Sequence, residues 1–183
     1  MHNKSPSHLV LFSVHDEGLT SLVNLQHNGK FAEALSKLEQ HYVFKVWKQE
    51  NKESYLAHVF IDTQYRGMII DIGYCNPDQT ITTFRITEKQ VIVSKPEEVL
   101  KQNDAPILPL SKEEVITTLA QALETAEHCQ KTKYPKSTPI KKFIVLQHLP
   151  IGQVYNITYV SQTMETLNMK ICAKTGAILE ENA

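Results

Sequence analysis

Three strand-like runs separated by short turns fill the last fifty residues of this chain and restrict what it can fold into. The runs cover residues 141–146, 154–160 and 167–173, and they are rich in β-branched, aromatic and alternating apolar side chains, as strands are. A turn at Lys174-Thr175-Gly176 then leads into a short last run at 177–179. This succession predicts an antiparallel meander, with Gly176 in a left-handed conformation and 169–173 paired with 177–181.

An amphipathic helix is predicted directly before this meander, at about residues 112–131. Ser111 and Glu114 have the spacing of a capping box, in which each side chain binds the backbone N–H of the other residue. The predicted apolar stripe consists of Val115, Leu119, Ala122, Leu123 and Ala126. A helix followed by a meander predicts an α+β fold in which the sheet wraps around the helix.

The chain ends on Met169-Lys170-Ile171-Cys172-Ala173-Lys174-Thr175-Gly176-Ala177-Ile178-Leu179, which is an alternating strand, a polar turn and a closing strand. Through these residues the segment 111–181 resembles the PepSY-like family, and residues 155–160 look like the central strand of that family. Cys172 stands where members often place Asp. The resemblance implies a cystatin-like fold, no cofactor, and a role in binding or restraining peptidases.

The pattern of the first half of the chain also predicts helices followed by strands. Helices are predicted at 19–25 and 30–40, and strands at 42–47, 55–61, 67–74, 80–87 and 91–93. Setting Tyr55 against Tyr155 aligns the strand patterns of the two halves. We therefore expect an N-terminal α+β lobe at 1–95, a Pro-containing connection at 96–110 and a PepSY-like lobe at 111–183. The alternative is one continuous sheet crossed by two helices.

Charge and hydropathy argue against a nucleic-acid-binding protein and against a membrane-spanning one. The 183 residues include 19 basic and 20 acidic side chains spread evenly, and this absence of a basic stripe argues against a nucleic-acid surface. No apolar run is long enough to predict a membrane span or a signal peptide. The expected location is the cytoplasm, or outside it if a leader has been removed, since PepSY-like proteins are often exported.

The cysteines and histidines suggest no metal or redox site. Cys75, Cys129 and Cys172 are an odd number at wide spacing, unlike a disulfide framework or a zinc motif. The eight histidines form no helical or strand pair with metal-ligand spacing. We predict no metal, no cofactor and no catalytic residue.

Two groups of residues are candidates for a site. His58 and Asp62 share one face of a predicted strand, with Asp71 on the next strand, and such a set can hold acid–base chemistry in a pocket of NTF2-like shape. The second group is aromatic and consists of Tyr155, Tyr159 and Trp47. If Tyr155 and Tyr159 face away from the helix, they form a binding surface, and if they face it, they belong to the core.

The sequence supports three functional hypotheses. The first is a non-catalytic module that binds a protein partner through its sheet face or an exposed edge strand. It could also inhibit that partner, as peptidase inhibitors do. The alternative is a small ligand-binding protein or enzyme with a pocket between helix and curved sheet. The third is a dimeric secretion-type chaperone, which leaves a homodimer open.

Overall fold

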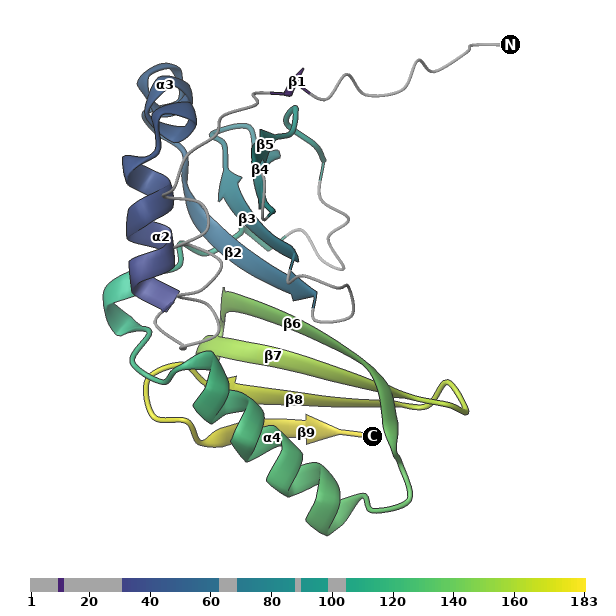
Figure 1. Cartoon of the computed structure of the whole chain (residues 1–183). Helices are drawn as coiled ribbons and strands as arrows, with labels where there is room; N and C mark the ends of the chain where they lie inside the picture. The colour runs from purple at the N-terminus through teal and green to yellow at the C-terminus, as the bar shows by residue number, and fades with distance from the viewer. Residues whose placement is uncertain (1–9, 12–30, 63–68, 88–89, 99–104) are drawn as a thin grey trace.

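One antiparallel sheet of nine strands organises the computed structural model of this chain (Figure 1). The structure describes residues 10–11, 31–62, 69–87, 90–98 and 105–183. The strand order is β1-β5-β4-β3-β2-β6-β7-β8-β9. The α+β class expected from the sequence is confirmed, whereas the predicted helix at 19–25 lies outside the described residues.

The bounds of the elements follow the sequence pattern over most of the described chain. The strands are β1 (Val10–Leu11), β2 (Tyr55–Asp62), β3 (Ile69–Cys75), β4 (Ile81–Ile86), β5 (Val91–Val93), β6 (Pro139–Leu149), β7 (Gly152–Ser161), β8 (Thr166–Cys172) and β9 (Ile178–Asn182). The helices are α2 (Phe31–Gln40), α3 (Tyr42–Glu50) and α4 (Leu119–Lys133), with a 3-10 turn, η1, at Lys112–Glu114.

Two meanders, β2 to β5 and β6 to β9, are joined through their first strands. β2 and β6 pair in antiparallel fashion from His58↔Gln147 to Asp62↔Phe143. The sheet is therefore continuous, which corresponds to the second of the two arrangements considered from the sequence. The division into segments 1–95, 96–110 and 111–183 stays a prediction.

The core lies between one face of this sheet and the three helices. Alternate strand residues point to that face and are almost completely buried, among them Val59, Ile61, Ile72, Phe84, Ile144, Leu146, Ile157 and Met169. Leu35 and Leu38 of α2 and Ala122 and Ala126 of α4 cover them with no exposed surface. Each aliphatic side chain buried in this way stabilises the fold by about 1.5–3 kcal/mol.

The segment 42–47 forms helix α3, so the prediction of a strand there was wrong. His41 caps the helix, since its Nδ1 accepts a hydrogen bond from the backbone N–H of Val43 at 3.3 Å. Phe44 and Trp47, one helical turn apart, contact the rings of Tyr74 and Phe84 with centroids 5.0–5.5 Å apart. This aromatic packing overrides the β propensity of the segment.

Helix α4 begins at Leu119, seven residues later than predicted. The working capping box is Thr118 with Gln121: Thr118 Oγ1 accepts from the Gln121 N–H at 3.2 Å, and Gln121 Oε1 accepts from the Thr118 N–H at 2.8 Å. The Ser111 side chain makes no cap hydrogen bond, and the 3-10 turn η1 that follows it is only three residues long. The four β-branched residues at 115–118 explain this, because they disfavour helix in succession.

The turn between β8 and β9 forms as predicted. Gly176 is left-handed with φ of 74°, its N–H donates to the Cys172 carbonyl at 2.9 Å, and the Cys172 N–H donates to the Ala177 carbonyl at 2.8 Å. Met169 pairs with Glu181 and Lys170 with Glu180. The expected pairing of 169–173 with 177–181 is confirmed.

Replacing the two candidate caps tests where the helix begins. Thr118→Ala removes a hydrogen bond to the first turn of α4 and is expected to lower the free energy of unfolding by about 1 kcal/mol. Ser111→Ala, the matched control, is expected to change it by less than about 0.5 kcal/mol. Urea unfolding of both variants measures the difference, and a larger loss for Ser111→Ala would contradict the assignment.

Gly176→Val tests the left-handed turn. A Cβ at Gly176 meets only Thr117 at 3.5 Å, an ordinary contact, so the cost comes from the positive φ. We expect a loss of about 1–2 kcal/mol, because a branched side chain is strained in this conformation. Lys174→Ala in the same turn should leave the thermal midpoint almost unchanged, and equal midpoints for the two variants would refute the explanation.

Candidate functional site

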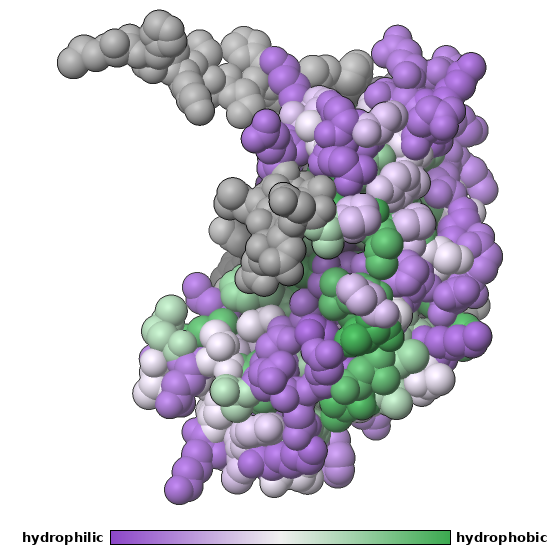
Figure 2. All heavy atoms as spheres, turned by 180° about the vertical axis from the view of Figure 1, so that it is seen from behind, coloured by the Kyte–Doolittle hydropathy of each residue, from purple (hydrophilic) through white to green (hydrophobic). Residues whose placement is uncertain are grey.

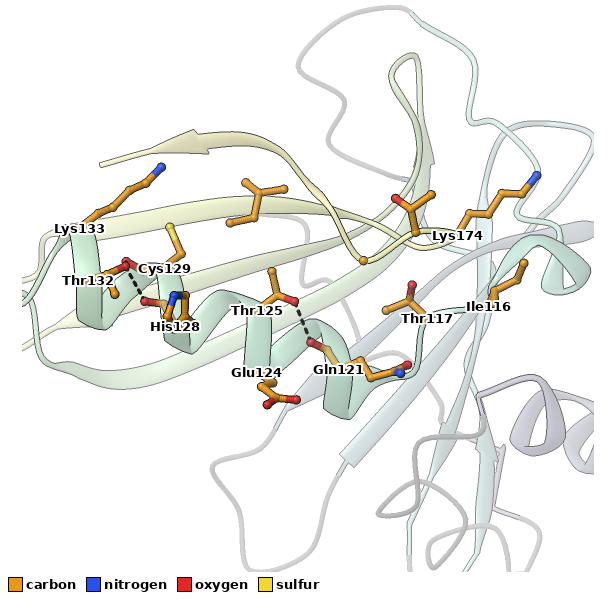
Figure 3. Close-up of a pocket in the computed structure, with 13 residues that line it drawn as sticks. Ile116, Thr117, Gln121, Glu124, Thr125, His128, Cys129, Thr132, Lys133 and Lys174 are labelled. Carbon is orange, nitrogen blue, oxygen red and sulfur yellow. Dashed lines mark hydrogen bonds between the residues drawn. The ribbon is translucent and has the colours of Figure 1, made fainter.

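A groove of about 850 Å³ lies between α4 and the segment that turns from β8 into β9 (Figure 3). Gln121, Thr125 and Cys129 line it from the helix. Lys174, Thr175, Gly176 and Ile178 line it from the turn and from β9. The lining mixes hydroxyl, amide and charged groups with a few apolar side chains, as sites for polar chain segments do.

The groove forms where α4 packs more closely on β7 and β8 than on β9. Ala122 and Ala126 face the sheet and are fully buried. Side chains this small let the helix approach the sheet closely, so the helix does not reach across to cover the last strand. The space beside it is the groove.

One end of the groove is closed by backbone hydrogen bonds. The N–H groups of Ile116 and Thr117 both donate to the Ala173 carbonyl, at 3.0 and 2.8 Å. The hydroxyl of Tyr155 donates to the Thr117 carbonyl at 2.8 Å. These bonds fasten the entry to α4 onto the sheet and form a wall across this end of the groove.

Thr117 stands at this wall with its hydroxyl toward the groove (Figure 3). The residue is only 7% exposed. Its two backbone groups are bonded to Ala173 and Tyr155, but no described residue donates to or accepts from its Oγ1. The hydroxyl oxygen is not one of the fully buried atoms and opens onto the groove, so it is available to a ligand.

The other end of the groove is crossed by a side-chain bridge. Lys133 on α4 forms an ion pair with Glu181 on β9 at 2.7 Å, and the Cys129 thiol donates to the same carboxylate at 3.1 Å. Lys133, and then Cys129, lower the pKa of Glu181, while burial followed by Glu181 raises the pKa of Cys129. The charge of Lys133 is thus already neutralised.

The strand beside the groove is an edge of the sheet. Within the described residues β9 pairs with β8 alone. An edge strand presents unpaired N–H and C=O groups along its free side, and these can pair with another extended chain. The groove therefore combines a free strand edge with hydrogen-bonding side chains.

The aromatic candidates lie away from this groove. Tyr155 and Tyr159 face the helices and are 0% and 2% exposed, so they belong to the core, the second of the two outcomes considered for them. Trp47 is partly buried and lines a smaller apolar groove of about 330 Å³ with Tyr42, Val46 and Val93. Tyr155 contributes to the site indirectly, because its hydroxyl donates a hydrogen bond to the Thr117 carbonyl.

His58 and Asp71 lie on the sheet face opposite the helices. His58 packs over Gly73, where an added Cβ would come within 2.4 Å of its ring, and Asp71 accepts two hydrogen bonds from Arg85, at 2.7 and 2.6 Å. Burial lowers the pKa of His58, against the raising effect of Asp71. These residues do not line the groove, and neither does Asp62 at the end of β2.

The opposite face also carries a band of hydrophobic residues (Figure 2). Phe60 of β2 and Phe143 of β6 stack there, with centroids 6.4 Å apart. Beside them Asn168 donates to Asn156 at 2.7 Å and to Thr158 at 2.9 Å. These amide and hydroxyl groups are satisfied by one another.

Neither a metal cluster nor a membrane span is found in the described part of the chain. No three His, Cys, Asp or Glu side chains lie close enough together there to hold an ion. No helix among those residues is long and apolar enough to cross a bilayer.

Comparison with known proteins supports the fold alone. No family model matches the chain, and no curated protein sequence matches it. It is similar to the crystal structure of a Clostridium difficile 630 protein described as a "putative lipoprotein", with a TM-score of 0.53 and 15% identity. The match covers 76% of this chain and 89% of that one.

Sequence reasoning missed most residues of the groove. Lys174 and Gly176 were identified only as parts of a turn. Thr117 carried no signal, because a hydroxyl becomes available only when its neighbours find partners elsewhere. The Thr118–Gln121 spacing was readable as a capping box and would have placed the wall correctly.

The half-buried His58 predicts a pH dependence of stability. Its folded pKa is lowered from 6.5, so the unfolded chain binds the proton more readily, and the stabilisation is complete above about pH 6.5 and declines as the pH falls through the folded pKa. His58→Gln should flatten the fall in unfolding free energy between about pH 7 and pH 5, by at most about 1.4 kcal/mol per pH unit. Urea unfolding at several pH values measures this. His128→Gln, on the exposed side of α4, should keep the parent slope, and a His58→Gln slope equal to the parent's would contradict the prediction.

Proposed function

We propose that this protein is a non-catalytic binding module that holds an extended segment of a partner protein in the groove between α4 and β9. The observation that carries the proposal is the position of the groove beside the free edge of β9. An extended segment that joins a sheet edge gains main-chain hydrogen bonds, while pockets beside the edge select its side chains.

The size of the groove suits a short segment. Helix α4 has 15 residues and forms one wall, which makes the wall about 22 Å long at 1.5 Å per residue. An extended chain rises about 3.3 Å per residue, so roughly seven residues fit along it.

The chemistry of the lining suits a polypeptide better than a lipid or a metal. Thr125 and Thr132 use their hydroxyls on helix carbonyls one turn earlier, at 3.1 and 2.8 Å, while keeping acceptor lone pairs toward the groove. Ile116 and Ile178 add apolar contacts to the lining. A lining that offers both polar and apolar contacts suits the alternating side chains of an extended peptide.

The groove is a better candidate than the uncovered sheet face. On that face the charge of Asp71 is matched by Arg85, and Asn168 is bonded to Asn156 and Thr158. A solvated face of this kind is ordinary for an antiparallel sheet. The groove instead offers a strand edge and an unbonded hydroxyl.

The PepSY-like assignment, the cystatin-like wrapping and a peptidase-inhibitory role remain proposals within this function. A partner segment held at a strand edge is compatible with all three. The alternative of a ligand-binding protein or enzyme built on His58, Asp62 and Asp71 has less support, because Leu35, Ile144 and Leu146 fill the space between helices and sheet. A cytoplasmic location also stays a prediction, and the description of the structural neighbour as a lipoprotein favours the exported alternative.

A library of displayed heptapeptides tests the proposal. Selected peptides should bind the full chain and shift the amide resonances of α4 and β9 in NMR spectra of the ¹⁵N-labelled protein. Thr125→Arg puts a long side chain into the groove and should weaken binding at least about tenfold, because the segment can no longer lie flat.

Ala120→Arg is the matched control, since Ala120 is exposed on α4 but does not line the groove. It should bind the peptides as the parent does. Failure to select any peptide, or equal affinity of the two arginine variants, would contradict the proposed function.

A further inference from the structure

The closed end of the groove differs from the Lys133–Glu181 end in charge and in hydrogen-bonding capacity. Lys174 lies at the closed end without an ion-pair partner among the described residues, whereas Lys133 at the other end is paired with Glu181. Helix α4 also begins at the closed end, and the N-terminus of a 15-residue helix carries a partial positive charge. Both contribute positive charge to this end of the groove.

Thr117 adds a hydrogen-bonding group at the same place. Its hydroxyl is available, its residue is more than nine-tenths buried, and it lies between the start of α4 and the turn that carries Lys174 (Figure 3). A hydroxyl donor at a helix N-terminus, with the flexible Lys174 side chain on the adjoining turn, matches the lone pairs of a carboxylate.

The backbone wall decides which part of a bound segment reaches this point. Ile116 and Thr117 are bonded to Ala173 through the main chain, so a chain lying along the groove cannot continue past them. The segment must end at the wall. A terminal ammonium group there would face Lys174 and the positive end of α4, whereas a terminal carboxylate would be attracted by both.

From these observations we infer that the closed end of the groove binds the C-terminal carboxylate of a partner polypeptide through the Thr117 hydroxyl and the Lys174 ammonium group. The inference rests on the proposed function. It makes the ligand a free C-terminal tail whose last residue lies at the wall. Such a tail runs from the Asn182 end of β9 toward the Ile178 end, and is therefore antiparallel to β9.

Among the described residues that line the groove, Glu124 alone is a carboxylate. It lies on α4 almost two turns beyond the N-cap Thr118, and so belongs to the middle of the groove rather than to the wall. Its negative charge repels an acidic side chain in the middle of a bound tail, but it lies away from the carboxylate site at the wall. We therefore expect tails that carry a terminal carboxylate without acidic residues two or three positions before it.

Two display formats test the inference. In one, heptapeptides are fused to the carrier through their N-termini and keep a free carboxylate, and in the other they are embedded in a loop. Binders should come from the first format. A selected peptide synthesised as the free acid should bind at least about tenfold more tightly than its C-terminal amide, as expected for loss of a charge-assisted hydrogen bond.

Variants at the wall locate the effect. Thr117→Val keeps the shape and removes the hydroxyl, and should weaken the free acid about tenfold while leaving the amide unchanged. Thr117→Ser keeps the hydroxyl and should retain most of the affinity. Lys174→Ala should weaken the acid several-fold, and Lys141→Ala, an exposed lysine on β6, should not. Thermal melts check that each variant is folded.

The outcomes separate this inference from the proposed function. Equal binding of acid and amide, both lost in Thr125→Arg, would overturn the carboxylate site and leave the peptide groove standing. Tight binding of an amide that ends in Asp or Glu would also overturn it, because a side chain would then supply the carboxylate. Absence of any peptide binder would overturn both.

Discussion

The antiparallel pairing of β2 with β6 is the interaction on which the rest of the structure depends. It joins the two meanders by main-chain hydrogen bonds over five residue pairs, and it lies in the middle of the core. Val59 and Ile61 on one side meet Ile144 and Leu146 on the other, so the apolar interior continues across the junction. Because the sheet is continuous, helices α2, α3 and α4 of the described residues cover the same face, and the two edges lie at opposite ends of the sheet.

The two edges of the sheet are finished differently. At one end the two-residue strand β1 covers β5. At the other end β9 has no further strand in the described chain, and it carries Glu180 and Glu181, paired with Lys170 and Lys133. Pairing β9 with the same strand of a second copy would bring these carboxylates together, which is unfavourable.

Local chemistry decided which predictions from the sequence succeeded. The strands of the C-terminal half and the left-handed Gly176 depend on alternation and on one backbone requirement, and both were predicted correctly. The segment 42–47 was assigned incorrectly, because Phe44 and Trp47 gain more from Tyr74 and Phe84 than a strand would give them. The alignment of Tyr55 with Tyr155 matches β2 to β7, whereas the topology makes β6 the counterpart of β2. Thr117 could not have been identified, since its free hydroxyl depends on Ala173 and Tyr155, far away in the sequence.

The two halves share a plan, and the size of the side chains beneath their helices accounts for the different surfaces they present. In the first half Phe44 and Trp47 fill the space between α3 and the strands, and the groove left beside α3 is small and apolar. In the second half Ala122 and Ala126 let α4 lie close to β7 and β8, so the helix stops short of β9. Large side chains under a helix fill the space between the helix and the neighbouring strands. Alanines fill less of that space, so a groove remains beside the helix. The larger, polar groove therefore forms in the second half, where the sheet also ends in a free edge.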